Sequence, residues 1–211
     1  MKKALITFAK APVPGTVKTR LQADMGAEKT VEIYKAFVTE ILSTCGRLRD
    51  IDRYLGCAPS MNHPFLKDMA RSYNMKTFTQ RGEGLGEKIF NAFRYCAKKG
   101  HSEIVLIGSD SPSMPIHLIR KAFIELKKKD FVIGPCFDQG LYLIGVTKGN
   151  INRIERNINL DTGKDVSMIL EKLHQMNIGF SMLPFWYDVD NLDDFRFLKL
   201  HLQYMNKKLP L

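Results

Sequence analysis

The stretch EIVLIGSDSPSMP (residues 103–115) joins a run of apolar residues to a sharp polar turn. The apolar run from 103 to 108 is nearly continuous, which is typical of a central parallel strand that is buried on both faces. The serines and prolines that follow turn the chain, and Ser113 is expected to cap a helix that extends to Lys129. Asp110 is therefore predicted to stand directly beyond the end of a buried strand.

Strand-like and helix-like segments alternate along the rest of the chain, which predicts one α/β domain over residues 1–211 with a mostly parallel sheet and at least one antiparallel strand. Runs of apolar and β-branched residues predict further strands at 4–8, 54–58, 75–79, 131–134, 141–146 and 180–189. Helical spacing of apolar residues predicts helices at 28–48, 64–73, 85–96, 162–176 and from 192 onward. Thr162 and Asp165 resemble a capping box at the start of one of them.

The chain is strongly basic, with 32 lysines and arginines against 22 acidic residues and a formal net charge of +10. Such an excess favours an anionic partner, such as a phosphorylated small molecule, a nucleic acid or an acidic membrane. The alternative is a lysine-rich surface that serves general solubility. Hydrophobic residues make up 45% of the chain, which is enough for a sizeable core and argues against disorder.

The four cysteines lack metal-binding spacing, so the sequence does not predict a zinc site. Three of them, Cys45, Cys57 and Cys96, have apolar flanks and are expected to be buried thiols in a reducing compartment. The apolar run near the N-terminus is interrupted by Lys10, and no segment approaches the ~20 apolar residues of a membrane span. We therefore expect a soluble, cytoplasmic protein.

A basic loop, KAPVPGTVKTR (residues 10–20), follows the first predicted strand. Its prolines stiffen the backbone, and Gly15 suits the third position of a type II turn. A glycine also lets backbone N–H groups approach an anion closely. Lys10, Lys18 and Arg20 are then placed to meet phosphate oxygens, whereas the alternative is a solvated loop whose charges never converge.

Carboxylates follow two of the predicted strands. Asp188 and Asp190, in the stretch WYDVDNLDDF, lie two residues apart, so in an extended segment both point to one face. Ligands of open α/β sheets bind at the carboxyl ends of the strands, where Asp110 is also expected. Mg²⁺ takes one or two carboxylates together with substrate phosphates, which predicts a site for Mg²⁺ or Mn²⁺. The alternative for these carboxylates is capping of a turn or helix; Asp193 and Asp194 are expected in the first turn of the closing helix.

Two further turns give weaker signals. QRGEGLGEKI (residues 80–89) places three glycines before a predicted helix, where they clear space for a base or ribose beside Gln80 or Arg81. Asp138 and Gly140 lie in a turn between two predicted strands. A plain loop explains the first stretch equally well, and a tight hairpin explains the second almost as well as a substrate contact does.

Together and in this order, KAPVPGTVKTRL, GSDSPSMP and WYDVDNLDDF resemble the bacterial DUF2064 proteins, which are glycosyltransferase-like and are associated in some genomes with arsenosugar biosynthesis. The likeness spans residues 5–195. More widely, the chain is similar to the nucleotide-diphospho-sugar transferase (GT-A) superfamily, including the molybdenum cofactor and phospholactate guanylyltransferases. The resemblance implies a three-layer α/β/α sandwich with a mostly parallel mixed sheet.

The resemblance also implies roles for individual residues. Lys18, Arg20 and Asp110 are predicted to be catalytic, and Asp110 and Asp190 are predicted to bind the metal, with Asp188 as the alternative to Asp190. The residues predicted to bind the nucleotide or substrate are Lys10, Pro14, Gly15, Lys18, Arg20, Gln80, Gly82, Leu85, Gly86, Ser109, Asp138 and Gly140.

Two departures from the family pattern fall on the expected acceptor side. Ser113 replaces an acidic residue, and Phe137-Asp138-Gln139-Gly140 replaces an acidic-Asp-Gly-Gly motif. The identity of the acceptor is therefore open even if the protein uses a nucleotide, and the base and the sugar of that nucleotide are open as well.

The sequence thus predicts a metal-dependent transferase that uses an activated nucleotide. In one version, a nucleotide-diphospho-sugar gives its glycosyl group to a small-molecule acceptor. In the other, a nucleoside triphosphate gives a nucleoside monophosphate to a phosphorylated small molecule. Both depend on positioning and charge stabilisation rather than on a protein nucleophile. A more distant alternative, a nucleic-acid-binding module, is motivated by the net charge and by the lysine run at 127–129, but no nucleic-acid-binding motif supports it, and we expect no nucleic-acid partner.

Overall fold

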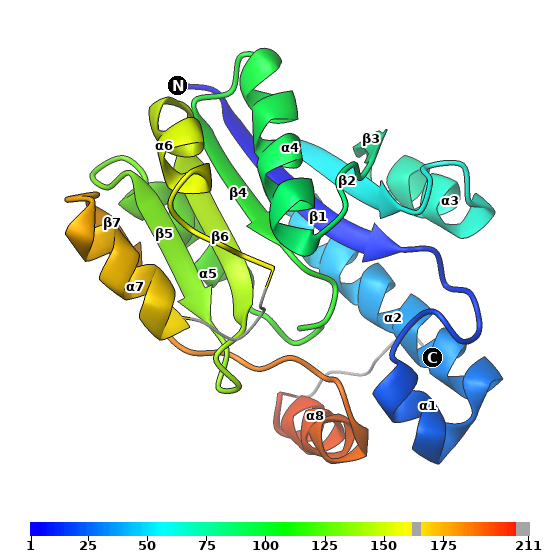
Figure 1. The fold of residues 1–211 in the computed structure, drawn as a ribbon. Coiled ribbons are helices and arrows are strands. Elements are labelled where there is room, and N and C mark those ends of the chain that lie inside the picture. Colours follow the sequence, from blue (N-terminus) through cyan, green and yellow to red (C-terminus); the bar gives the residue numbers. More distant parts are fainter. Residues whose placement is uncertain (162–165, 206–211) are drawn as a thin grey trace.

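The computed structural model of the chain describes residues 1–161 and 166–205, with a seven-stranded sheet at its centre (Figure 1). The strands lie in the order β3-β2-β1-β4-β6-β5-β7. Neighbouring strands are parallel except where they pair with β6, which runs antiparallel to β4 and β5. This confirms the mostly parallel mixed sheet. The strands are β1 (Lys3–Lys10), β2 (Asp52–Ala58), β3 (Lys76–Thr79), β4 (Glu103–Ile107), β5 (Phe131–Pro135), β6 (Leu141–Thr147) and β7 (Phe180–Met182).

Helices cover both faces of the sheet, which confirms the three-layer α/β/α arrangement. Helices α2, α3 and α5 pack on one face, and α4, α6 and α7 pack on the other. Figure 1 shows α4 and α6 in front of the sheet and α2 and α5 behind it. The helices are α1 (Thr19–Met25), α2 (Ala27–Gly46), α3 (Pro64–Ser72), α4 (Leu85–Lys98), α5 (Ile116–Glu125), the 3₁₀ helix η1 (Lys148–Asn150), α6 (Ile151–Glu155), α7 (Val166–Gln175) and α8 (Leu192–Tyr204).

The central strands send alternate side chains into two separate cores. In β1, Ile6 packs with α4, α6 and α7, whereas its neighbour Leu5 packs with α2, α3 and α5. In β4, Leu106 and Val105 divide in the same way. Because both faces are covered, these strands need apolar residues at most positions, which explains the nearly continuous apolar runs in the sequence.

The order of the strands reverses direction between β1 and β4. From β1 the chain moves outward to β2 and β3, and it then crosses back to place β4 on the other side of β1. Right-handed crossovers put α2 and α3 on one face and α4 on the opposite face. Such a switch point opens a crevice at the carboxyl ends of the two strands, where open α/β sheets bind their ligands.

Some predictions about helices are wrong. Ser113 does not cap α5; the helix begins after Pro115 without a side-chain cap and ends at Glu125 rather than at Lys129. The hydroxyl of Ser113 instead takes part in hydrogen bonds with the side chains of Tyr187 and Trp186. A proline before the first helical residue already fixes the entry geometry, so a capping side chain is not needed there.

The last predicted strand is also shorter than expected. β7 covers only 180–182, and the chain after it contacts β5 through a backbone hydrogen bond from Leu183 to Ile133 and an isolated bridge between Cys136 and Trp186. Helix α1 was not predicted; it packs with α2 and α8 in a third, smaller core. The predicted capping box at Thr162 and Asp165 lies outside the described residues. Within the described part of the chain, no helix is both long and apolar enough to span a membrane.

Candidate active site

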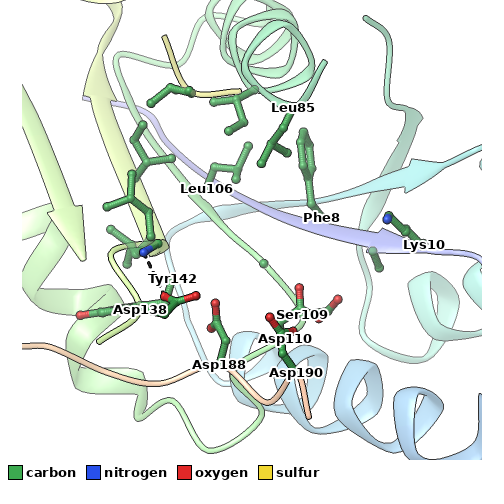
Figure 2. Close-up of a pocket in the computed structure, with 18 of the residues that line it drawn as sticks. Phe8, Lys10, Leu85, Leu106, Ser109, Asp110, Asp138, Tyr142, Asp188 and Asp190 are labelled. Atoms are coloured by element: carbon green, nitrogen blue, oxygen red, sulfur yellow. Dashed lines mark hydrogen bonds between the residues drawn. The ribbon is translucent and has the colours of Figure 1, made fainter. Parts of the chain in front are cut away.

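A cleft of about 580 Å³ opens at the carboxyl ends of β1 and β4, at the switch point of the sheet (Figure 2). Of the residues predicted to form the site, those that line the cleft are Lys10, Lys18, Arg20, Gln80, Leu85, Ser109, Asp110, Asp138, Gly140, Asp188 and Asp190. The remaining four, which are Pro14, Gly15, Gly82 and Gly86, are not among its lining residues. The fold therefore brings most of the predicted residues together from five separate chain segments.

Lys18 lies between two carboxylates at one end of the cleft. Its ammonium nitrogen is 2.5 Å from Oδ1 of Asp110 and 2.8 Å from Oδ1 of Asp190. The side chain of Lys18 is only 4% exposed, whereas Arg20 is 69% exposed and lies 3.6 Å from the other oxygen of Asp190. The charges of the basic loop and the acidic turns thus converge, and the alternative of a solvated loop does not apply to Lys18.

Local backbone interactions hold the two acidic turns against each other. The N–H group of Val189 donates to the carbonyl oxygen of Asp110 over 2.9 Å. Immediately afterwards, the N–H groups of Asp190 and Asn191 donate to the carboxylate of Asp194. Asn191 in turn caps α8, with its side chain accepting from the backbone of Asp194 in a capping box. The start of α8 therefore positions Asp190, and Asp193 and Asp194 lie in the first turn of that helix, as the sequence predicted.

Two residues on the path of the basic loop to the carboxylates, Gly15 and Lys18, have positive φ angles. Gly15 has φ +81° in the turn between Val13 and Thr16, whose N–H group bonds the carbonyl of Val13 as a type II turn requires. Lys18 has φ 47° at the start of α1, which is uncommon for a residue with a side chain. We attribute this backbone strain to the ion pairs that draw Lys18 inward.

Asp188 and Asp190 differ in their protonation behaviour. Although burial acts in the opposite direction, the charges of Lys18 and Arg20 hold the pKa of Asp190 below its usual range. Burial and the neighbouring charge of Asp110 raise the pKa of Asp188 to about 6. Asp188 also accepts a hydrogen bond from the hydroxyl of Ser111. Asp190 is thus the better charged ligand, and Asp188 is held in hydrogen bonds within the protein.

Tyr34 on α2 is a cleft residue that sequence reasoning missed. Its hydroxyl accepts a hydrogen bond from the N–H group of Lys10 over 2.8 Å and shares another with Ser109 over 3.0 Å. Burial raises the pKa of Tyr34 to about 12, so the phenol keeps its proton. It therefore ties the segment after β1 to the segment after β4. Tyr34 occupies a core position in the helical pattern, so only its polar tip distinguishes it in the sequence.

Two glycines of the turn at residues 80–89, Gly84 and Gly86, are needed for contact with Asp161 rather than for space in the cleft. The N–H group of Gly86 donates to the carboxylate of Asp161, and a side chain at Gly84 would overlap that carboxylate. The side-chain amide of Gln80 donates to the carbonyl oxygen of Gly56 over 2.8 Å. Leu85, at the start of α4, is half exposed and faces the cleft.

The carboxylates at the charged end suit a divalent cation. Asp110 and Asp190 both contact one cationic atom, the ammonium nitrogen of Lys18, which shows that a single ion between them can reach both. Their oxygens are the hard ligands that Mg²⁺ and Mn²⁺ prefer. Among the residues described, no group of three or more histidine, cysteine or acidic side chains is arranged to hold a metal by itself. Such an ion would need oxygen ligands from a substrate as well.

Solved structures resemble this chain over nearly its whole length. A crystal structure from Desulfovibrio desulfuricans, assigned as a nucleotide-diphospho-sugar transferase, has a TM-score of 0.85 and 30% sequence identity over 96% of this chain and 89% of the other. A 4-diphosphocytidyl-2C-methyl-D-erythritol synthase from Anaerococcus prevotii has a TM-score of 0.65 and 13% identity over 96% of this chain and 99% of its own. Rv0371c from Mycobacterium tuberculosis, solved in complex with manganese, has a TM-score of 0.57 and 13% identity, covering 94% and 98% of the two chains.

The sheet order and these likenesses define a protein with the nucleotide-diphospho-sugar transferase fold. The chain belongs to the family DUF2064, described as uncharacterized proteins conserved in bacteria, whose model matches residues 41–160. No curated protein matches the chain.

Proposed function

We propose that the protein is a metal-dependent transferase that uses an activated nucleotide, and that it moves a glycosyl group from a nucleotide-diphospho-sugar to a small-molecule acceptor. The observation that carries this proposal is the contact of Lys18 with both Asp110 and Asp190 at the switch point of the sheet. The likeness to the D. desulfuricans structure, at 30% identity, supports the same class of substrate.

The basic end of the cleft is suited to a diphosphate. Lys10 and Arg20 have exposed side chains there, and Arg20 can present its guanidinium as a fork to two phosphate oxygens. Lys18 already holds its charge inside the cleft. As the sugar is transferred, negative charge grows on the leaving diphosphate, and fixed cations close to it stabilise that charge.

Asp110 and Asp190 would hold the divalent ion, Mg²⁺ or Mn²⁺, which would supply further neutralisation of the diphosphate when bound. Asp188 is less suited to this role because its carboxylate already accepts a hydrogen bond from Ser111 and its pKa is raised to about 6. Tyr34 would contribute by holding Lys10 and Ser109 in register, since its hydroxyl bonds to both. No protein nucleophile is required, because the acceptor itself attacks the anomeric carbon.

The second candidate is nucleotidyl transfer from a nucleoside triphosphate. Three cations line the basic end, which is more than a diphosphate needs, and the fold is shared with the A. prevotii synthase. In this version the acceptor attacks the α-phosphate and pyrophosphate leaves.

Product analysis distinguishes the two reactions. Purified protein is incubated with Mg²⁺ or Mn²⁺, a panel of nucleotide sugars and nucleoside triphosphates, and candidate acceptors. Release of a nucleoside diphosphate from a nucleotide sugar supports glycosyl transfer, and release of pyrophosphate supports the second candidate. Asp110→Asn should abolish either product, whereas Asp24→Asn, an exposed aspartate on α1, should not. Nucleotide turnover that is equal in both variants would contradict the proposed site.

A further inference from the structure

The cleft has two ends of different chemical character. Among the described residues that line it, the lysines and arginines are Lys10, Lys18 and Arg20, which lie at the end of β1, in the loop that follows and in the first turn of α1. The opposite end is formed by the turn between β5 and β6, by β6 itself and by Asn159, Leu160 and Ile169. Its charged lining residues, as far as the structure describes them, are carboxylates.

Two carboxylates line one wall of this second end. Figure 2 shows Asp138 and Asp188 on the same side of the cleft, with Asp188 between Asp138 and Asp110. Asp138 is exposed, and among the residues that the structure describes its side chain accepts only the N–H group of Gly140, two residues away. A carboxylate has about four lone-pair sites, so Asp138 keeps acceptor capacity for a ligand.

The facing wall is apolar. Figure 2 shows Phe8, Leu85 and Leu106 on the side opposite the carboxylates. Leu106 of β4 is paired in register with Ile144 of β6, and both also line the cleft. The wall is completed by Ile89, Leu160 and Ile169.

A hydrogen bond anchors part of this wall. The carboxylate of Asp161 accepts from the N–H group of Gly86 over 2.7 Å, which fixes the segment holding Leu160 against the start of α4. Leu160 is 5% exposed, so it packs into the core as well as facing the cleft. The apolar wall is therefore built from residues of β1, β4, β6, α4 and α7 and from one anchored segment, and all of its named residues except Leu85 are buried.

We propose that this end binds an uncharged group that carries hydroxyls and one apolar face, which is the chemistry of a sugar or a polyol, and that it disfavours a phosphorylated group. Hydroxyl groups donate to carboxylates such as Asp138, and the C–H face of a ring buries apolar area against Leu106 and Ile144. A phosphate would face the carboxylates of Asp138 and Asp188, whereas the described lysines and arginines of the lining lie toward the other end, and like charges repel.

This inference rests on the proposed function and makes its substrate more specific. It favours an uncharged acceptor or the sugar of the donor at this end, and it argues against the phosphorylated acceptor of the nucleotidyl version. Both sources, acceptor and donor sugar, present the same chemistry to the cleft.

The test uses three ring compounds that differ in charge: glucose, glucosamine and glucose 6-phosphate. Their binding is measured by saturation-transfer NMR with Mg²⁺ and a saturating nucleoside diphosphate, so that the basic end is filled; uridine, guanosine and cytidine diphosphates are tried in turn. Glucose and glucosamine should bind, and glucose 6-phosphate should bind at least about tenfold more weakly, as expected for one unfavourable charge contact. Equal or tighter binding of glucose 6-phosphate, or binding by none of the three, would overturn the proposal.

Variants test whether Asp138 causes the weaker binding of glucose 6-phosphate. Asp138→Lys should allow glucose 6-phosphate to bind, whereas Asp68→Lys, an exposed aspartate on α3, should not. Lys164 lies outside the described residues, so Lys164→Gln is measured as well. If the parent protein binds glucose 6-phosphate and Lys164→Gln does not, the proposal is overturned.

Two further measurements distinguish the donor sugar from the acceptor as the bound group, and distinguish a failure of this inference from a failure of the proposed function. If the end holds the donor's sugar, replacing the diphosphate with a nucleotide sugar should displace glucose; if it holds the acceptor, glucose should remain bound. If none of the nucleotides binds, the proposed function fails, but the ranking of the three ring compounds on the protein alone still supports or overturns this inference.

Discussion

The ammonium nitrogen of Lys18 lies 2.5 Å from Oδ1 of Asp110, and it contacts Asp190 at the same time. The lysine comes from the loop after the first strand, Asp110 from the turn after β4, and Asp190 from the segment before α8. The side chain of Lys18 is almost completely buried, so its charge depends on these two partners for solvation. The contact therefore links the predicted phosphate loop to the predicted metal ligands.

Removing the ammonium group should free the carboxylates. In Lys18→Met, Asp110 and Asp190 lose their shared counter-ion, and we expect Mn²⁺ to bind about tenfold more tightly in the absence of nucleotide, which corresponds to about one pKa unit of altered interaction. Nucleotide affinity should fall in the same variant. Calorimetric titration with Mn²⁺ and then with a nucleoside diphosphate measures both effects. Lys29→Met, an exposed lysine on α2, is the control, and a variant at Lys18 with unchanged metal affinity would count against the shared site.

Arg20 should contribute to nucleotide binding without contributing to stability. Its guanidinium is 69% exposed, so Arg20→Ala is expected to weaken nucleotide affinity roughly three- to tenfold, more at low salt than at high salt, and to leave the unfolding midpoint unchanged. Arg196 is equally exposed and also pairs with an aspartate, which makes Arg196→Ala a matched control. Equal nucleotide affinities in the two variants would show that Arg20 does not contact the ligand.

The hydroxyl of Tyr34 should stabilise the floor of the cleft. Tyr34→Phe leaves the N–H group of Lys10 and the hydroxyl of Ser109 without their partner, and we expect a loss of about 1–3 kcal/mol in the free energy of unfolding. Urea unfolding monitored by circular dichroism measures it. Tyr204→Phe at the exposed end of α8 should change stability by no more than about 0.5 kcal/mol. A Tyr34 variant as stable as this control would mean that the two hydrogen bonds are not formed.

Gly134 in β5 has no room for a side chain. A Cβ atom there would overlap the aromatic ring of Tyr142, whose hydroxyl donates to the carbonyl oxygen of Pro184. Gly134→Ala is therefore expected to destabilise the protein by about 1–3 kcal/mol through overpacking. Thermal unfolding measures this loss. Gly149 has open space around the position of a Cβ atom, so Gly149→Ala should leave the stability of the protein nearly unchanged in the same experiment. Similar melting temperatures for the two variants would contradict the packing of Tyr142.

Asp52 should make stability depend on acid pH. Hydrogen bonds from Lys76 and His101 hold the pKa of Asp52 below its usual value, so the folded state binds the proton less tightly than the unfolded chain does. Its contribution is therefore present above about pH 4 and is lost as the pH falls through the lower pKa of the folded state. Denaturant unfolding should show the parent more stable than Asp52→Asn at neutral pH, with the difference shrinking below about pH 4. A difference that stays constant with pH would refute this assignment, and Asp68→Asn is the control.

The sequence predicted the structure correctly at positions where the residue type has a single conformational or chemical role. Gly15 in its turn, the apolar run ending at Ile107 and the acidic pair in the first turn of α8 all lie where they were predicted. The clustering of Lys18 with Asp110 also followed from the rule that ligands gather at the carboxyl ends of parallel strands.

Features that depend on tertiary contacts could not be read from the sequence. Tyr34 has the spacing of a core residue, and only the approach of two distant loops gives its hydroxyl a role. Ser113 looks like a helix cap, but Tyr187 and Trp186 engage its hydroxyl instead. The late strand was predicted too long because the extended residues after 182 keep only scattered backbone hydrogen bonds to β5, from Leu183 to Ile133 and from Trp186 to Pro135, rather than a regular ladder.

The central claim is that one cleft holds a diphosphate and a divalent ion between the basic loop and the acidic turns. Anomalous diffraction from crystals grown with Mn²⁺ and a nucleoside diphosphate tests it most directly. We predict a manganese peak between Asp110 and Asp190, with phosphate density extending toward Lys18 and Arg20. A manganese peak or diphosphate bound elsewhere on the protein, with Lys18 still seated between the two carboxylates, would contradict the account.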